Sequence, residues 1–314
     1  MLAFTNVLAQ KFVKQVVHAY PSYRRTGRAS CAGLPGMTIE LYCEFLSQDT
    51  SLGGQHTSRT GNPRSVLHTT SLSTEIIQTV DKFWAADFGC PREMLRSEGT
   101  IMVCHPNQYS DWKGIFILRI DSAPIISLPR DLFSSLCTEA RQWSTTQVFD
   151  STQLRSLVGS RVDKIIGPAF IGYTERGKFQ PIESRSTTVL GNEHSGHVAS
   201  LRAACDSIDW EHGGHELGEN PAVGVFVEKE LAALASYDVW SDRIAHIFIL
   251  THPRYRRHGY ACAAVSRLVE IALERGLVPQ YRTLESNTAS MKIAARLGFT
   301  RYATTMTVGL HPKS

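Results

Sequence analysis

The sequence predicts a fold that mixes α-helices and β-strands (α/β in the broad sense, α+β in the strict one). Strands and helices follow one another through the C-terminal part of the chain. Residues 247–250 are an apolar run with the β-branched content of a buried strand. From Tyr260 onward, apolar residues recur at spacings of three and four, which is one face of a helix. The composition, with 42% hydrophobic and 20% charged residues, is that of an ordinary globular protein.

Residues 1–74 differ in composition from the rest of the chain. No acidic residue precedes Glu40, and the stretch from Ser47 to Ser73 is rich in Ser, Thr, Gly and Gln. We interpret this part as a poorly ordered extension with a linker. The alternative is an organelle transit peptide, which has the same basic, acid-free composition.

The cysteines, the charge and the hydropathy pattern limit the location and the partners. The seven cysteines are scattered and form no Cys-x-x-Cys pair, which favours reduced thiols in the cytoplasm over a disulfide framework or a zinc knuckle. No apolar run approaches the length of a membrane span. The net charge of +4 is small and dispersed, so we expect no nucleic-acid partner and no membrane partner. The oligomeric state is not predicted.

Residues 75–184 are expected to form an N-terminal domain. The strand candidate at 125–128 lies between two prolines, which places it at a sheet edge. The other expected elements are a helix over 75–88, strands over 101–104 and 114–120, helices over 131–143 and 151–158, and a strand over 167–173.

Residues 185–314 are expected to form a second domain of order β–β–β–α–β–α–β after a first helix. A polar, glycine-containing loop is expected over 210–216. The remaining elements are a helix over 195–208, a hairpin of 222–228 with 230–237, a strand over 244–250, a helix over 260–275, a strand over 278–284, a helix over 288–297 and a strand over 302–310.

The stretch from Ile247 to Ala261 predicts an anion site. Pro253 ends the strand because proline cannot donate to a ladder, and Gly259 lies in the turn that follows. The first N–H groups of the next helix have no partner within that helix. The basic residues Arg256 to His258 add positive charge around them. A phosphate-bearing ligand is therefore expected at this junction.

The same stretch resembles a known family. Arg256-x-x-Gly259-x-Ala261 is similar to the (Gln/Arg)-x-x-Gly-x-(Gly/Ala) signature of the GNAT superfamily of N-acetyltransferases. The preceding Thr-His-Pro resembles the end of that family's fourth strand. The downstream Asn287-x-x-Ser290-x-x-Ile293-Ala294-x-x-Leu297-Gly298-Phe299 resembles the family's later Asn…Leu-Gly-Phe motif. The resemblance implies a GNAT-type mixed, mostly antiparallel central sheet flanked by helices over 185–314. Residues 75–184 would then be a diverged, GNAT-like N-terminal half.

The resemblance also implies a set of cofactor-binding residues. The signature loop would hold the pyrophosphate of acetyl-CoA, the central strand would pair with its pantetheine arm, and one amide near Ile249 or Leu250 would face the thioester oxygen. The residues implied are Ile249, Leu250, Thr251, Arg256, Arg257, His258, Gly259, Tyr260, Ala261, Cys262 and Asn287.

Several residues are candidates for the general base that takes a proton from an amine. Glu228 follows a strand beside the central one, and Glu211, His212, His215 and Glu216 lie in the expected polar loop. Each is also explained as a solvated loop residue. His212-x-x-His215 has metal-ligand spacing but no clear further ligand, so no metal is expected.

The general acid departs from the family pattern. Many relatives place a tyrosine seven residues after the Asn, and this sequence has Ala294 there. Tyr302 or another phenol substitutes, or water protonates a thiolate that leaves unaided. Asn287 is equally explained as a helix N-cap. Cys262 is expected to be a small buried residue, although a thiolate near an anion site is the alternative.

These residues predict an acetyl-CoA-dependent N-acetyltransferase that moves an acetyl group to a primary amine by direct attack. The acceptor is a small-molecule or peptide amine, and the acidic and histidine residues of 210–216 would suit a cationic one. The alternatives are a non-catalytic acyl-CoA-binding module and an adaptor that keeps the fold alone.

Overall fold

The computed structural model describes residues 72–109, 112–121, 123–140, 142–144, 146–182 and 186–311. The extension, linker and transit-peptide interpretations of residues 1–71 therefore lie outside the described residues. Within these ranges, no helix combines the length and the apolar character needed to cross a membrane.

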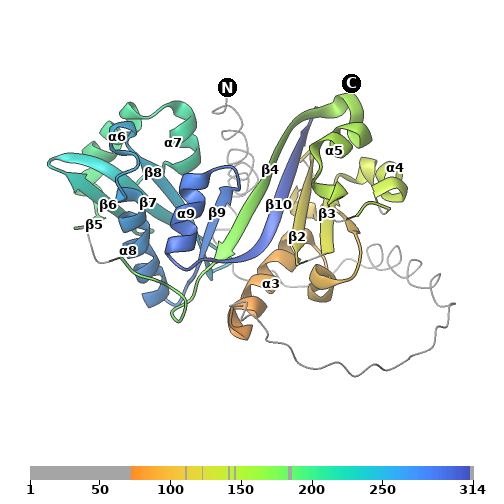
Figure 1. Ribbon diagram of the computed structural model, residues 1–314, viewed down its shortest axis with the longest axis horizontal. Helices are drawn as coiled ribbons and strands as arrows, with labels where there is room; N and C mark the ends of the chain where they lie inside the picture. Colours follow the sequence, from red (N-terminus) through yellow and green to blue (C-terminus); the bar gives the residue numbers. More distant parts are fainter. Residues whose placement is uncertain are drawn as a thin grey trace, which may run out of the picture. The chain divides into compact units, whose positions relative to one another are not determined.

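The described strands form one ten-stranded sheet with the order β1-β3-β2-β10-β4-β9-β8-β7-β6-β5 (Figure 1). Its pairs are antiparallel except β1 with β3 and β8 with β9, which confirms the expected mixed, mostly antiparallel sheet. The strands are β1 (Ile101–Cys104), β2 (Gly114–Ile120), β3 (Ala123–Leu128), β4 (Val162–Tyr173), β5 (Thr188–Leu190), β6 (Ala222–Val227), β7 (Glu230–Trp240), β8 (Ile244–Thr251), β9 (Val278–Leu284) and β10 (Thr300–Leu310).

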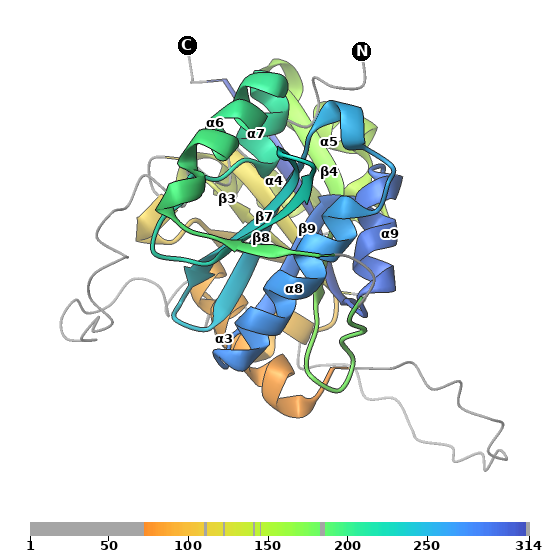
Figure 2. The ribbon, with the colours of Figure 1, turned by 90° about the vertical axis from the view of Figure 1, so that its left-hand side faces the viewer.

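Helices cover both faces of the sheet. Ala245 and Ile247 of β8 pack with α8 and α9, and α8 crosses β7 and β8 in Figure 2. The alternate residues face the other way, where Leu250 packs with α6 and Ile244 with α3. The helices are α3 (Thr74–Phe88), α4 (Arg130–Ala140), α5 (Ser151–Val158), α6 (Ser195–Ala204), α7 (Ser207–Gly213), α8 (Tyr260–Glu274) and α9 (Thr288–Arg296).

Strand β10 joins the two halves of the sheet. It pairs antiparallel with β2 on one side and with β4 on the other. The strands of 75–184 and of 185–314 therefore share one hydrogen-bonded sheet. The division into two domains at residue 184 remains a prediction.

Two expectations about local structure were wrong. Strand β3 lies between β1 and β2, and β1 forms the edge instead. Pro124 is tolerated because pairing with β1 begins only at Ile125, so its missing N–H is not needed there. The expected helix over 195–208 ends at Ala204, and Asp206 caps a second helix, α7, by accepting a hydrogen bond from the Asp209 N–H at 2.6 Å.

A half-buried histidine just after β1, His105, makes the stability of the protein depend on pH. The Nε2–H of His105 donates to the Gly114 carbonyl at 2.9 Å, so Nδ1 accepts from the Ser127 hydroxyl at 2.7 Å. Burial lowers the pKa of His105 from 6.5 to about 4. His105 binds a proton more readily in the unfolded chain than in the folded one. The contribution of neutral His105 to the unfolding free energy is therefore complete above pH 6.5 and is lost as the pH falls towards 4.

We expect the unfolding free energy measured with urea to fall by about 2–3 kcal/mol between pH 7 and pH 4 because of His105. A His105→Gln variant removes the titrating group, so its unfolding free energy should fall less over the same range. Equal losses for the two proteins would show that His105 is not the group responsible.

Candidate functional site

The central feature of the candidate site is the separation of β8 from β9. These parallel strands pair over Ile244–His246 and Val278–Gln280 and then diverge, β8 staying with β7 and β9 with β4. The His252 N–H donates to the Ala232 carbonyl at 3.0 Å. By the alternation of a strand, Ile249 and Thr251 therefore direct their backbone groups away from β7. No described strand pairs with them on that side.

Helix α7 ends against this part of β8. A Cβ at Gly213 would lie 1.9 Å from the carbonyl oxygen of Ile249, so only glycine allows this approach. The expected loop over 210–216 is therefore wrong for residues 210–213, which form the last turn of α7. This helix fixes the backbone of Ile249 from the side opposite β7.

The basic turn between β8 and α8 has the geometry of an anion site. Arg257 and Gly259 both have positive φ values, 67° and 82°. The first backbone hydrogen bond of α8 runs from the Ala263 N–H to the Gly259 carbonyl at 3.2 Å, so the preceding amides lie ahead of the helical ladder. Arg257, His258 and Gly259 are exposed, Tyr260 and Ala261 half-buried, and no atom lies within 4 Å of a Cβ built at Gly259.

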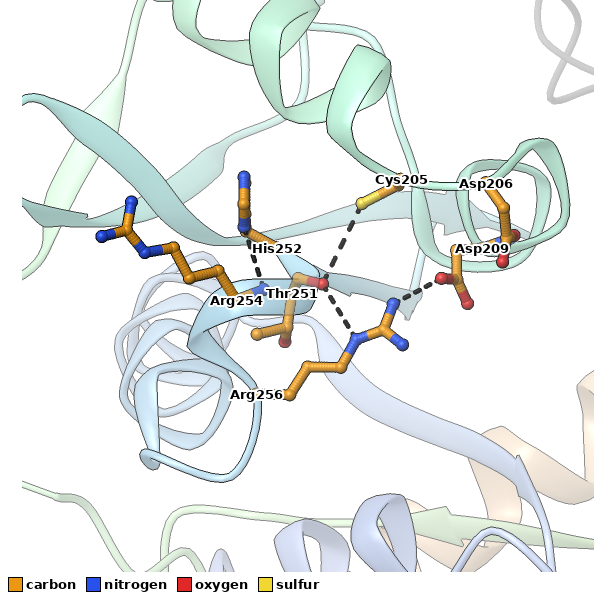
Figure 3. Close-up of polar contacts among 7 residues, drawn as sticks. All are labelled: Cys205, Asp206, Asp209, Thr251, His252, Arg254 and Arg256. Carbon is orange, nitrogen blue, oxygen red and sulfur yellow. Dashed lines mark hydrogen bonds and ion pairs between the residues drawn. The ribbon is translucent and has the colours of Figure 1, made fainter.

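The Arg256 side chain ties the turn to its neighbours (Figure 3). Its Nη2 donates to the Asp209 carboxylate of α7, and its Nε donates to the Thr251 carbonyl at 3.4 Å. The Cys205 thiol lies 4.0 Å from the same carbonyl. The Arg256 guanidinium is therefore held by α7 and β8, whereas the Arg257 side chain beside it is exposed.

Two other predicted cofactor residues have structural roles as well. The Asn287 side chain caps α9 by accepting a hydrogen bond from the Ser290 N–H at 3.1 Å, as its alternative explanation predicted. Cys262 is buried in the first turn of α8, and burial raises the pKa of its thiol. A protonated thiol is no nucleophile, so the small-residue interpretation of Cys262 is favoured.

The structure separates the predicted general bases. Glu228 is exposed in the β6–β7 turn with a φ of 54°. Glu216 is exposed and forms an ion pair with Arg202 at 2.7 Å. Glu211 and His212 are half-buried on α7. These placements do not bring Glu228 together with the α7 residues.

His215 is the candidate base with a defined partner. Its Nε2 lies 3.1 Å from Oδ1 of Asp238 on β7, and its ring stacks on Phe248 of β8, with ring centroids 5.1 Å apart. Both polar side chains are mostly buried, with side-chain exposures of 21% and 13%. Sequence reasoning missed Asp238, although an acid within the apolar run 231–240 was a signal that could have found it.

Tyr302 does not lie with these residues, and its prediction as the general acid is corrected. It is buried under α3, its hydroxyl donates to Asp81 at 2.7 Å, and its ring meets Tyr173 edge-on. Burial raises the pKa of Tyr302 far above its usual range. Tyr281 is one phenol packed with α8 and α9, and its hydroxyl lies 3.0 Å from that of Ser290.

No group of three or more His, Cys, Asp or Glu side chains is arranged to hold a metal ion in the part of the chain that the structure describes. His215 of the weak metal pattern lies 3.1 Å from the Asp238 carboxylate.

Comparisons with known proteins give one family match. Residues 215–307 match the family model described as GNAT acetyltransferase. No curated protein sequence matches the chain.

Solved structures with some likeness to this chain carry names of the same kind. An acetyltransferase from the GNAT family of Colwellia psychrerythraea is 12% identical, with a TM-score of 0.42, over 76% of this chain and 97% of that one. A GCN5-related N-acetyltransferase-like protein from Streptococcus suis is 16% identical, with a TM-score of 0.42, over 76% and 99%. A GCN5-related N-acetyltransferase from Kribbella flavida is 17% identical, with a TM-score of 0.40, over 51% and 64%.

Proposed function

We propose that the protein moves an acetyl group from acetyl-CoA to a primary amine, in keeping with the match of residues 215–307 to the family model described as GNAT acetyltransferase. The single observation that carries the proposal is the open, basic turn before α8. It lies directly after β8, the strand whose backbone lacks a partner strand on one side in the described part of the chain.

The turn fits a pyrophosphate on three grounds. Its amides precede the helical ladder of α8, its exposed Arg257 supplies positive charge, and Gly259 leaves space where a side chain would stand. The N–H groups of Ile249 and Thr251, which point away from β7, would donate hydrogen bonds to the pantetheine arm, because the two carbonyls on that side already meet Gly213 and Arg256. Acetyl-CoA supplies the activated acetyl group, and the Ile249 amide would polarise its carbonyl.

We propose His215 as the general base. Because Asp238 accepts from Nε2–H, the Nδ1 atom of His215 is the acceptor for a proton from the amine. The amine nitrogen forms its bond to the acetyl carbon, its proton passes to Nδ1, and the carbon–sulfur bond breaks. The thiolate leaves without a dedicated acid, since burial raises the pKa of Tyr281 to about 12 and makes that phenol a weak proton donor.

Calorimetric titration of acetyl-CoA tests the turn directly. A Gly259→Glu variant places a carboxylate where the pyrophosphate would lie, so binding should weaken by about 100-fold or more. Gly259→Ala is the matched control. Its Cβ meets no atom within 4 Å, so it should cost about 1–2 kcal/mol of stability through its positive φ and change binding little.

The outcomes separate the rival functions. Binding that Gly259→Glu removes, without turnover of any amine, would leave a non-catalytic acyl-CoA-binding module. The absence of binding by the unmutated protein would overturn the proposal and leave an adaptor that keeps the fold alone.

A further inference from the structure

One arginine beside the separated strands is not used by the proposed chemistry. Arg282 lies on β9, two residues after Gln280, so both side chains leave the same face of the sheet. The Oε1 atom of Gln280 accepts a hydrogen bond from Nδ1–H of His246 on β8 at 2.7 Å on that face. Arg282 therefore stands just beyond the point where β8 and β9 separate.

The guanidinium of Arg282 has unused donors. It lies 5.7 Å from the centre of the Phe116 ring. Among the described residues it makes no hydrogen bond and no ion pair, whereas Arg202, Arg256 and Arg301 each pair with a carboxylate. The side chain keeps part of its surface exposed. Desolvation nevertheless lowers the pKa of Arg282 to about 10, because the charged guanidinium is largely removed from water.

The carboxylate that acts on Arg282 electrostatically forms no ion pair with it among the described residues. Asp87 of α3 acts on Arg282 electrostatically, but no ion pair joins the two, and Asp87 accepts a hydrogen bond from the Tyr109 hydroxyl. Desolvation raises the pKa of Asp87 to about 6. An arginine presents five N–H donors in a planar fork that matches a carboxylate. A ligand carboxylate would supply the bonds that the protein does not.

The position of Arg282 relates it to the amine. On the same face, β8 carries Phe248 with the His215 ring stacked on it. His215 is therefore stacked against β8, and Arg282 belongs to β9, on the same face of the two separating strands. A molecule lying between them would have its amine near the base and its far end near the guanidinium.

We propose that Arg282 binds a carboxylate of the acceptor, so that the acceptors are amines that also carry a carboxylate group, as free amino acids and short peptides do. The presence of an amine at the other end of the acceptor rests on the proposed function. The carboxylate contact itself stands on the Arg282 environment and is testable without turnover.

Product analogues test the contact by binding alone. N-acetyl amino acids and N-acetyl dipeptides would be titrated calorimetrically into the full chain, each against its C-terminal amide, which has the same shape without the charge. We expect acids to bind about 10- to 100-fold more tightly than the matched amides, as a charge-assisted pair in a recessed site predicts. If the N-acetyl amino acids bind more tightly than the N-acetyl dipeptides, the acceptors are free amino acids; the reverse order identifies short peptides.

Variants locate the effect. Arg282→Gln should remove the preference for acids, and Arg282→Lys should keep a reduced preference, because it retains the charge without the fork. Arg301→Gln, at an arginine already paired with Glu285, should leave the preference intact. Arg282→Gln removes a desolvated cation that has no ion pair among the described residues, so it should unfold at the same or a higher urea concentration. If it fails to fold, the Lys variant decides.

The result is independent of the phosphate turn. Gly259→Glu should lose acetyl-CoA binding and keep the acid preference, so failure of the proposed function and failure of this contact are distinguishable. Equal binding of acids and amides, no binding of any acid, or an acid preference that survives Arg282→Gln would overturn the proposal.

Discussion

Alanine at Gly213 is expected to disrupt the contact between α7 and β8. Its Cβ would lie 1.9 Å from the Ile249 oxygen and 2.8 Å from the Ile249 carbonyl carbon. Both are backbone atoms of a strand held by β7, so no flexible side chain can move aside. The helix must shift, at a cost of about 3 kcal/mol or more. Urea unfolding measures this cost, and acetyl-CoA titration should show weaker binding because the Ile249 backbone shifts with it.

Gly196→Ala is the matched control for that variant. Gly196 lies in the first turn of α6, and no atom lies within 4 Å of a Cβ built on it. Alanine there should be neutral or stabilising by about 0.5–1 kcal/mol. If Gly213→Ala were as stable as Gly196→Ala and bound acetyl-CoA normally, the close approach of α7 would not determine the position of Ile249.

Loss of the His215 imidazole is expected to lower kcat/KM by about 100- to 10,000-fold, the usual range for a general base. His215→Asn keeps a polar side chain of similar size without a titrating nitrogen. Asp238→Asn should reduce kcat/KM less, because it removes the carboxylate that sets the tautomer of His215 while leaving the ring in place. Rates measured across pH should lose the limb that reports the base in His215→Asn.

Tyr302→Phe provides the contrasting variant. It removes a donor from the buried Asp81 carboxylate, so stability should fall by about 1–3 kcal/mol while kcat is unchanged. A fall in kcat with Tyr302→Phe, together with normal rates for His215→Asn, would contradict the assignment made from the structure.

Local patterns predicted most of the elements but few of their contacts. The strands at 101–104, 114–120 and 278–284 and the helix at 151–158 begin and end as expected, because alternation and helical periodicity are local properties. The end of α7 was missed because Gly213 and Gly214 are typical of a loop. Glycine stands at position 213 because α7 approaches the Ile249 backbone there, and such a contact between two elements is not visible in a local sequence pattern.

The signature turn was predictable and the side chains around it were not. The order Arg256, Gly259, Ala261 encodes a turn before a helix, which is a backbone geometry. By contrast, the pairing of His215 with Asp238 depends on the register of β7 beside β8. Tyr302 was misplaced because the face from which β10 presents it follows from pairing with β2 and β4.

The place of β10 has a consequence for how the chain folds during synthesis. Strands β1, β3 and β2 connect to the rest of the sheet through β10 alone among the described strands. A ribosome makes residues 300–310 after all the other described strands, so the nascent chain holds two unconnected partial sheets until then. The edges of β2 and β4 that β10 will occupy are exposed in that interval, and edges of this kind promote aggregation. The last pairing also spans a very long sequence separation, which makes it slow. Newly made chains should therefore depend on protection of these two edges more than the finished protein does.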